Sequence, residues 1–241
     1  MVTKNQIKLV KSLQQKKYRI QHKMFVAEGK KLVGELLSAG MEPVALYETE
    51  NGIMGNTHFQ ISSAAASDMK KMSGLKTPSR VLGVFKIPQT KPMDTSDWVL
   101  VLDAVRDPGN LGTIIRLCDW YGIAHLVCSN DTVDVYNPKV LQATMGSVAR
   151  VNVIYEDLEH FLAATKLPVY GAFMDGENVY REKFPKKGML VMGSEASGIS
   201  NGIEKLVDKK ISIPQYGEKS AESLNVATAT AVLLNEIRRD G

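Results

Sequence analysis

The sequence has few of the features that mark secreted, membrane-spanning or disulfide-bonded proteins. Its 241 residues include two cysteines, Cys118 and Cys128, which are too few for a disulfide framework or a four-cysteine zinc site. The first residues lack the apolar segment of a standard secretion signal, and nowhere do eighteen apolar residues run together. We therefore expect a reduced, cytoplasmic, globular protein without a membrane span or a bound metal.

Two common nucleotide-binding fingerprints are also missing. Gly193 and Gly198 have the spacing of the two P-loop glycines, but Ile199 stands where the phosphate-binding lysine would be. The glycine pattern of the dinucleotide-binding fold does not occur. The sequence thus disfavours a nucleoside triphosphatase and a dinucleotide-dependent enzyme. It also contains no internal repeat and no low-complexity tract.

The positive charge is unevenly distributed. Lys and Arg exceed Asp and Glu by 30 to 26, a mild excess that favours an anionic partner. Residues 1–31 hold nine of the basic residues against a single acid, Glu28. This run is either a solvated helix face or a surface that contacts nucleic-acid phosphates, and composition leaves both open. The RNA-contacting candidates are Lys16, Lys17, Arg19 and Lys23.

The first ninety residues are typical of a small α/β domain. Apolar spacing predicts helices around 7–13 and 32–37, and short buried strands at 43–47 and 81–87. A polar, proline-containing stretch follows from Pro88 to Asp97. We predict one domain over 1–90, a linker over 91–97 and a second domain over 98–241.

The second domain alternates short apolar runs with helical patterns. The runs lie at 98–102, 125–128, 169–173, 189–192 and 210–213, and the helical patterns at 111–121, 138–149, 156–166 and 224–239. Such alternation predicts a mostly parallel sheet covered by helices. Ligands of these sheets bind outside the carboxyl ends of the strands, so we expect the site in the loops after 102, 192 and 213.

Each of these loops also has a purely structural interpretation. In the first, Pro108 and Gly109 predict a turn, and Asn110 is well placed to cap the following helix. Arg116 lies among apolar neighbours, which predicts that its charge has a partner. In the third loop, Ser223 and Asn225 are typical helix-start residues. Taken singly, none of the loops identifies a function.

Taken together and in order, the loops resemble the three signature motifs of the SpoU/TrmH family of RNA ribose 2′-O-methyltransferases, in the SPOUT superfamily. The motifs are Asp-Pro-Gly-Asn-Leu-Gly with Arg116 six residues after the Asn, then Gly-Ser-Glu-x-x-Gly, then Ile-Pro followed by Ser-Leu-Asn-Val-Ala. One departure is Ala196, where many members have glycine. The preceding domain resembles a small RNA-binding domain of ribosomal-protein-L30e type, because Phe25–Val33 is similar to the stretch that opens its second helix.

The resemblance implies a Rossmann-like parallel sheet with a C-terminal trefoil knot that binds S-adenosylmethionine. The implied cofactor-binding residues are Ala172, Gly193, Ile213, Ser223 and Leu224. The implied catalytic residues are Asn110, Arg116, Glu195, Ser223 and Asn225. Arg116 would hold an RNA phosphate and stabilise alkoxide charge, since a guanidinium stays protonated, and Glu195 would orient Arg116 or Asn110.

The resemblance further implies a homodimer acting on ribosomal RNA, with transfer RNA as the second choice. Its interface would use the first-motif helix and the last helix, whose apolar residues could equally be core; they are Ile114, Ile115, Leu117, Trp120, Leu233, Leu234 and Ile237. Two other functions compete: a catalytically silent RNA-binding module, and an α/β enzyme with another nucleotide cofactor. The presence of Arg116, Glu195 and Asn225 counts against the silent module.

Overall fold

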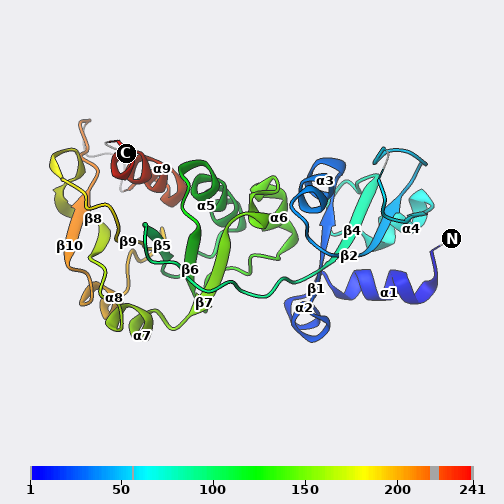
Figure 1. Cartoon of the computed structure of the whole chain (residues 1–241), viewed down its shortest axis with the longest axis horizontal. Helices are drawn as coiled ribbons and strands as arrows, with labels where there is room; N and C mark the ends of the chain where they lie inside the picture. Colours follow the sequence, from blue (N-terminus) through cyan, green and yellow to red (C-terminus); the bar gives the residue numbers. More distant parts are fainter. Residues whose placement is uncertain (1, 56, 218–222, 240–241) are drawn as a thin grey trace. The chain divides into compact units, whose positions relative to one another are not determined.

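A computed structural model describes residues 2–55, 57–217 and 223–239 of the chain. It divides into two compact units, one of Met1–Gln89 with Asp134–Arg150, the other of Thr90–Val133 with Val151–Gly241 (Figure 1). Among the described residues, no helix is long and apolar enough to cross a bilayer. The division differs from the predicted boundaries, because residues 134–150 lie with the N-terminal residues and the predicted linker 91–97 is part of the second unit.

The first unit is built on a four-stranded sheet in the order β1-β4-β2-β3. The strands are β1 (Met24–Glu28), β4 (Val81–Lys86), β2 (Pro43–Glu48) and β3 (Ile61–Ser63), and only the β2–β3 pair among them is parallel. Its N-terminal helices are α1 (Lys4–Ser12), α2 (Lys16–His22), α3 (Lys30–Ser38) and α4 (Ala66–Met72). The Phe25–Val33 stretch that we assigned to a helix opening is a strand up to Glu28, and the helix begins at Lys30. Buried aromatic and β-branched residues in 25–28 favour the strand.

Residues 134–150 complete the first unit. They contain α6 (Pro138–Thr144) and a 3₁₀ turn, Ser147–Ala149, where we predicted one continuous helix. The Tyr136 ring packs on Phe25 with the ring centres 4.6 Å apart, and the Gln142 amide donates to the Glu28 carbonyl at 2.6 Å. Gly146, at φ +103°, has no room for a Cβ, which would lie 2.5 Å from Glu35 Cβ. Residues 134–150 are therefore part of the core of the first unit, although in the sequence they lie between segments of the second unit.

Arg19 is buried in the first unit, which corrects its assignment as an RNA-contacting residue. Its side chain is 4% exposed and pairs with Asp134, to which Nε donates at 3.0 Å. Nη1 donates to the carbonyls of Leu13 and Gln14, both at 2.9 Å. A buried guanidinium needs such partners, because unpaired burial of a charge is costly. Arg19 fastens 134–150 to the N-terminal helices and is not available to RNA phosphates.

The second unit is a six-stranded sheet in the order β10-β8-β9-β5-β6-β7, with every neighbouring pair parallel, as predicted. The strands are β5 (Val99–Leu102), β6 (His125–Ser129), β7 (Asn152–Glu156), β8 (Val169–Asn178), β9 (Met189–Met192) and β10 (Lys209–Ser212). The helices are α5 (Pro108–Tyr121), α7 (Leu158–Ala163), α8 (Asn201–Glu204) and α9 (Val226–Ile237), and a short 3₁₀ turn covers Val179–Arg181. The α/β parallel fold is confirmed, whereas the trefoil knot stays a prediction.

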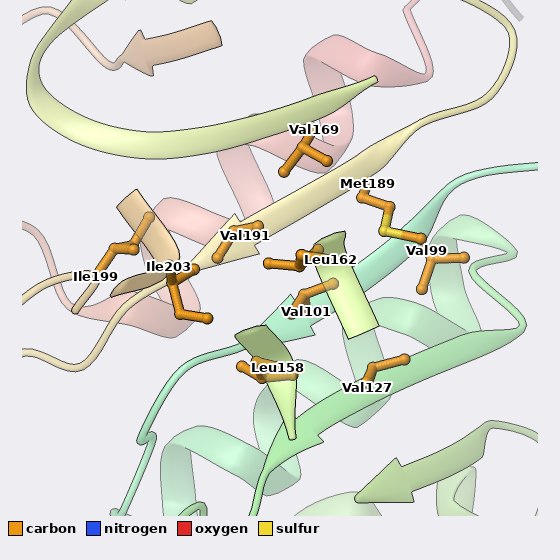
Figure 2. Packing of buried hydrophobic residues seen from close by; sticks show 10 residues of the cluster. All are labelled: Val99, Val101, Val127, Leu158, Leu162, Val169, Met189, Val191, Ile199 and Ile203. Atoms are coloured by element: carbon orange, nitrogen blue, oxygen red, sulfur yellow. The ribbon is translucent and has the colours of Figure 1, made fainter. Parts of the chain in front are cut away.

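Helices cover the sheet of the second unit. Leu158 and Leu162 of α7, with Ile199 and Ile203, pack on strand residues that include Val101 and Val191 (Figure 2). The helices α5 and α9 pack against each other, and α5 also contacts β6. Burial of the strands on both faces explains their near-continuous apolar sequences, and it leaves the strand ends as the places for polar side chains.

Removal of Arg19 should destabilise the first unit. Arg19→Ala leaves Asp134 without its buried partner, so we expect the free energy of unfolding to fall by about 3–5 kcal/mol. Urea denaturation followed by circular dichroism measures this, with the neighbouring exposed Lys17→Ala as the matched control. Replacing both partners, as in Arg19→Met with Asp134→Leu, should recover much of the loss. A single Arg19→Ala variant as stable as Lys17→Ala would contradict the structural role.

Candidate functional site

The candidate site lies at the carboxyl ends of three strands of the second unit. From the central strand β5 the chain continues to β6 and β7, whereas β9, β8 and β10 lie on the other side of β5. The loops after β5 and β9 thus leave neighbouring strands at the point where the order reverses, which is where open α/β sheets bind ligands. The loops after 102, 192 and 213 that the sequence singled out meet here.

Asn110 joins the three loops through its side-chain amide. Its nitrogen donates to Glu195, from the loop after β9, and its oxygen accepts from the Asn225 amide nitrogen at 2.9 Å. Asn225 precedes α9 and its own side-chain oxygen caps that helix, accepting from the backbone N–H groups of Ala227 and Thr228 at 3.0 and 3.3 Å. Of the five predicted catalytic residues, three are therefore connected by hydrogen bonds, with Asn110 between Glu195 and Asn225.

The start of α5 differs from the sequence prediction in a way that explains why Asn110 is available. The helix begins at Pro108, with Asp107 as its N-cap: Asp107 Oδ1 accepts from the Asn110 backbone N–H at 2.8 Å. Proline is favoured at this first helical position because its missing N–H would have no partner there. Asn110 is therefore neither the cap nor part of a turn, and its side chain is left for Glu195 and Asn225.

The loop after β9 is held in a narrow form by backbone contacts. Ser194 and Gly198 exchange two backbone hydrogen bonds, of 3.1 and 2.9 Å. A Cβ on Gly193 would lie 2.1 Å from the Gly198 carbonyl carbon, so only glycine fits. The missing side chain of Gly193, one of the predicted cofactor-binding residues, thus permits close approach of the loop's own backbone. Gly198 adopts φ +65°, the left-handed conformation that glycine tolerates.

Asp103, which directly follows β5, binds the end of the loop after β9. It was not among the residues predicted from the sequence. Its side chain is buried, and Oδ2 accepts from the Ser200 backbone N–H at 2.7 Å. A charge-assisted hydrogen bond of this kind fixes the far end of the loop that carries Glu195. The signal available in the sequence was an acidic residue directly after a fully apolar strand, a position where burial needs a partner.

A cavity of about 410 Å³ opens beside the hydrogen-bonded group. All five predicted cofactor-binding residues line it, and so does Glu195; the five are Ala172, Gly193, Ile213, Ser223 and Leu224. The rest of the wall is largely apolar and was not predicted from the sequence; it includes Phe173, Met174, Met192, Pro214, Gln215 and Ala229. The volume lies within the range of small-molecule sites. Ser223, predicted for both roles, lies on the cavity wall.

Arg116 is exposed, and the partner that we expected for its charge stays a prediction. Within the described residues it makes no hydrogen bond or ion pair. Its apolar neighbours Ile114 and Ile115 are buried on another face of α5, because successive helical residues point about 100° apart. Arg116 follows Asn110 by six residues, which is about 9 Å along the axis of α5. A solvated guanidinium at this place can meet an anion that approaches the site.

The basic run of the first unit keeps three of its four candidates. Lys16, Lys17 and Lys23 are exposed, and the Lys17 ammonium lies 4.7 Å from the centre of the Tyr18 ring.

Residues 2–55, 57–217 and 223–239 contain no group of three or more His, Cys, Asp or Glu side chains that could hold a metal ion.

Comparison with known proteins gives two family matches along the chain. Residues 97–235 match the SpoU rRNA Methylase family, and residues 4–83 match the MRM3-like substrate binding domain. The 23S rRNA (guanosine(2553)-2′-O)-methyltransferase RlmP of Bacillus subtilis is 33% identical over 243 residues, which cover 98% of this chain and 97% of that protein.

Solved structures agree with these matches. A structure from Porphyromonas gingivalis described as an RNA methyltransferase of the TrmH family is 38% identical, with a TM-score of 0.91 and 100% of both chains covered. An AdoMet-bound rRNA methyltransferase from Sinorhizobium meliloti is 28% identical, with a TM-score of 0.84 over 99% of this chain and 96% of that one. The family resemblance of the three ordered motifs is therefore confirmed. With more than half of its length matched, the chain belongs to the SpoU rRNA methylase family.

Proposed function

We propose that this enzyme transfers a methyl group from S-adenosylmethionine to a ribose 2′-hydroxyl of structured RNA, with ribosomal RNA as the first choice of substrate and transfer RNA as the second. The observation that carries the proposal is the contact of Asn110, Glu195 and Asn225 at the rim of the apolar cavity. Names of relatives support the choice of ribosomal RNA, because RlmP and the Sinorhizobium enzyme are both rRNA methyltransferases.

The cavity suits S-adenosylmethionine in its chemistry. Its apolar wall would take the adenine, and the backbone groups of Gly193 and Ile213 would supply polar contacts. The Glu195 carboxylate at the cavity edge complements a cationic sulfonium. The bound cofactor supplies the activated methyl group. The role of Ala172, Gly193, Ile213, Ser223 and Leu224 is then to bind and orient it.

The polar group at the rim would position the acceptor. Glu195 accepts from the Asn110 amide nitrogen and Asn225 donates to its oxygen, so two hydrogen bonds hold the three side chains together. Both α5 and α9 begin here, and the positive ends of their dipoles favour negative charge that develops on the attacking oxygen. Arg116 would hold the adjacent RNA phosphate or stabilise the same developing charge.

We propose a division of labour and a dimeric state in line with this function. The first unit would capture RNA through Lys16, Lys17 and Lys23. Two copies would associate through α5 and α9 in the cytoplasm. Trp120, which is 85% exposed on α5, supports the dimer. Ile114, Ile115, Leu233, Leu234 and Ile237 are buried within the unit itself, so they belong to its core, and the interface relies on the exposed face of α5.

The experiment that tests the proposal measures cofactor binding and methyl transfer together. Purified protein should release or take up heat with S-adenosylmethionine in metal-free buffer, and should transfer labelled methyl to ribosomal RNA at a 2′-hydroxyl. Gly193→Ala should abolish both, because its Cβ would collide with the Gly198 backbone. Gly34→Ala, with nothing within 4 Å of the added Cβ, is the control and should bind as wild type does. No heat with wild type would exclude the assignment.

Arg116 should matter for transfer and little for cofactor binding. Arg116→Ala removes a cation aimed at developing negative charge, so we expect methyl transfer to fall by a factor on the order of 10²–10³. Arg116→Lys should recover little, since a point charge does not reproduce a planar fork. Arg106→Ala is the control, because Arg106 is an exposed cation of the same loop region that pairs with Asp131. Turnover of Arg116→Ala equal to that of Arg106→Ala refutes the role.

The three exposed lysines of the first unit should contribute to RNA affinity through counterion release. Replacing Lys16, Lys17 and Lys23 by Gln should lower the slope of log K against log salt by roughly 0.7–0.9 for each lost phosphate contact. A matched control replaces three exposed lysines of the second unit, Lys183, Lys186 and Lys187. Binding to one RNA at several salt concentrations gives both slopes. If the two triple variants behave alike, RNA capture by the first unit is wrong.

A further inference from the structure

Two helices of the second unit, α5 and α9, are hydrogen-bonded to each other at both of their ends. Both α5 and α9 begin at the site, where Asn110 and Asn225 are hydrogen-bonded, and the two helices pack against each other (Figure 1). Both end where Arg238, the residue after α9, reaches across to the end of α5. The helices therefore run side by side in the same direction, tied together at each end.

The tie at the carboxyl ends is made by one guanidinium. Arg238 Nε donates to the Tyr121 carbonyl at 3.0 Å, and Nη2 to the Gly122 carbonyl at 3.4 Å. Nη1 and Nη2 donate to the two carboxylate oxygens of Asp97 at 2.8 and 2.7 Å. The contact with Arg238 holds the pKa of Asp97 below its usual range. A bidentate pair of this kind is geometrically specific.

Asp97 connects this tie to the sheet. It directly precedes Trp98, whose backbone N–H donates to Asp97 Oδ1 at 2.7 Å, and the buried strand β5 follows. The loop that leads into α5, and so to Asn110, leaves the other end of β5. Arg238 thus sets α9 against the same strand and the same helix that place Asn110.

The tie contributes geometry more than stability. The side chains of Arg238 and Asp97 are 28% and 46% exposed, and ion pairs of such exposure add little to stability. Position is more demanding. A 2.9 Å hydrogen bond joins Asn225 to Asn110, so a slide of α9 by about 1 Å would bring it outside hydrogen-bonding range. Misplacement of that size at a reacting centre costs on the order of 10²-fold in rate.

We propose that Arg238 and Asp97 are positioning residues for the methyl-transfer site. They fix the register of α9 on α5, and through it the contact of Asn225 with Asn110, about 20 Å away at 1.5 Å per residue of the helix. This inference rests on the proposed function for its kinetic consequences. Its structural consequence, order at the start of α9, does not depend on activity.

The decisive experiment is a double-mutant cycle between the two ends of α9. Arg238→Ala and Asp97→Asn should each lower kcat at least tenfold with KM for RNA changed less than threefold, and Arg238→Lys should not restore kcat. Arg239→Ala is the control, since Arg239 is the adjacent arginine and pairs with Glu236 on its own helix turn. The folded fraction and the mass in solution are measured for each variant.

The cycle distinguishes positioning from general stabilisation. If Arg238 acts through Asn225, then Asn225→Ala with Arg238→Ala is no slower than Asn225→Ala alone. Independent sites this far apart would multiply their effects, and that result overturns the proposal. A loss of kcat that equals the loss of folded protein would also overturn the proposal.

A second measurement keeps the inference separate from the proposed function. Hydrogen exchange at Ala227 and Thr228, whose N–H groups Asn225 caps, should be at least tenfold faster in Arg238→Ala and unchanged in Arg239→Ala. If wild type transfers no methyl group, the proposed function fails, and the exchange result still decides the register. Equal exchange in wild type and Arg238→Ala overturns the register proposal whatever the activity.

Discussion

The contact that the site depends on is the side-chain amide of Asn110, which bonds to Glu195 on one side and to Asn225 on the other. A single planar group thereby joins loops that leave β5, β9 and β10. An amide suits this task because it is donor and acceptor at once without carrying charge. It can serve a carboxylate and a second amide in one plane, beside a cavity whose wall is mostly apolar.

Asn110 and its two hydrogen-bond partners are each held in place by separate local contacts. Asp107 takes over the capping of α5, the narrow Gly193–Gly198 loop with its Asp103 anchor places Glu195, and the cap of α9 holds Asn225. Such supporting contacts matter because functional groups act only within a fraction of an ångström of their productive geometry. The apolar cavity and the polar rim are built by the same loops, so cofactor and acceptor would be positioned by one structure.

The first unit depends on a different constraint, the burial of Arg19 against Asp134. Three chain crossings, at 89–90, 133–134 and 150–151, connect the units. The segment from 134 to 150 fills the first unit's core through Tyr136 and Gln142. The linker of 91–97 that composition predicts is therefore one of several covalent connections. The apolar pattern of 138–149 predicted a helix, but it did not indicate in which of the two units the helix would be buried.

The sequence by itself determined the family, the parallel α/β fold of the second unit and the place of the site, because the alternation of strands with helices is a local pattern and each of the three motifs is contiguous. It also contained every residue of the hydrogen-bonded group. The tertiary structure alone decided which of the candidate side chains are free. Asn110 was released from capping by Asp107, whereas Arg19 was withdrawn from the surface by Asp134, 115 residues away. The reason is physical: burial and hydrogen-bond satisfaction depend on partners that are distant along the chain, and no local pattern specifies them.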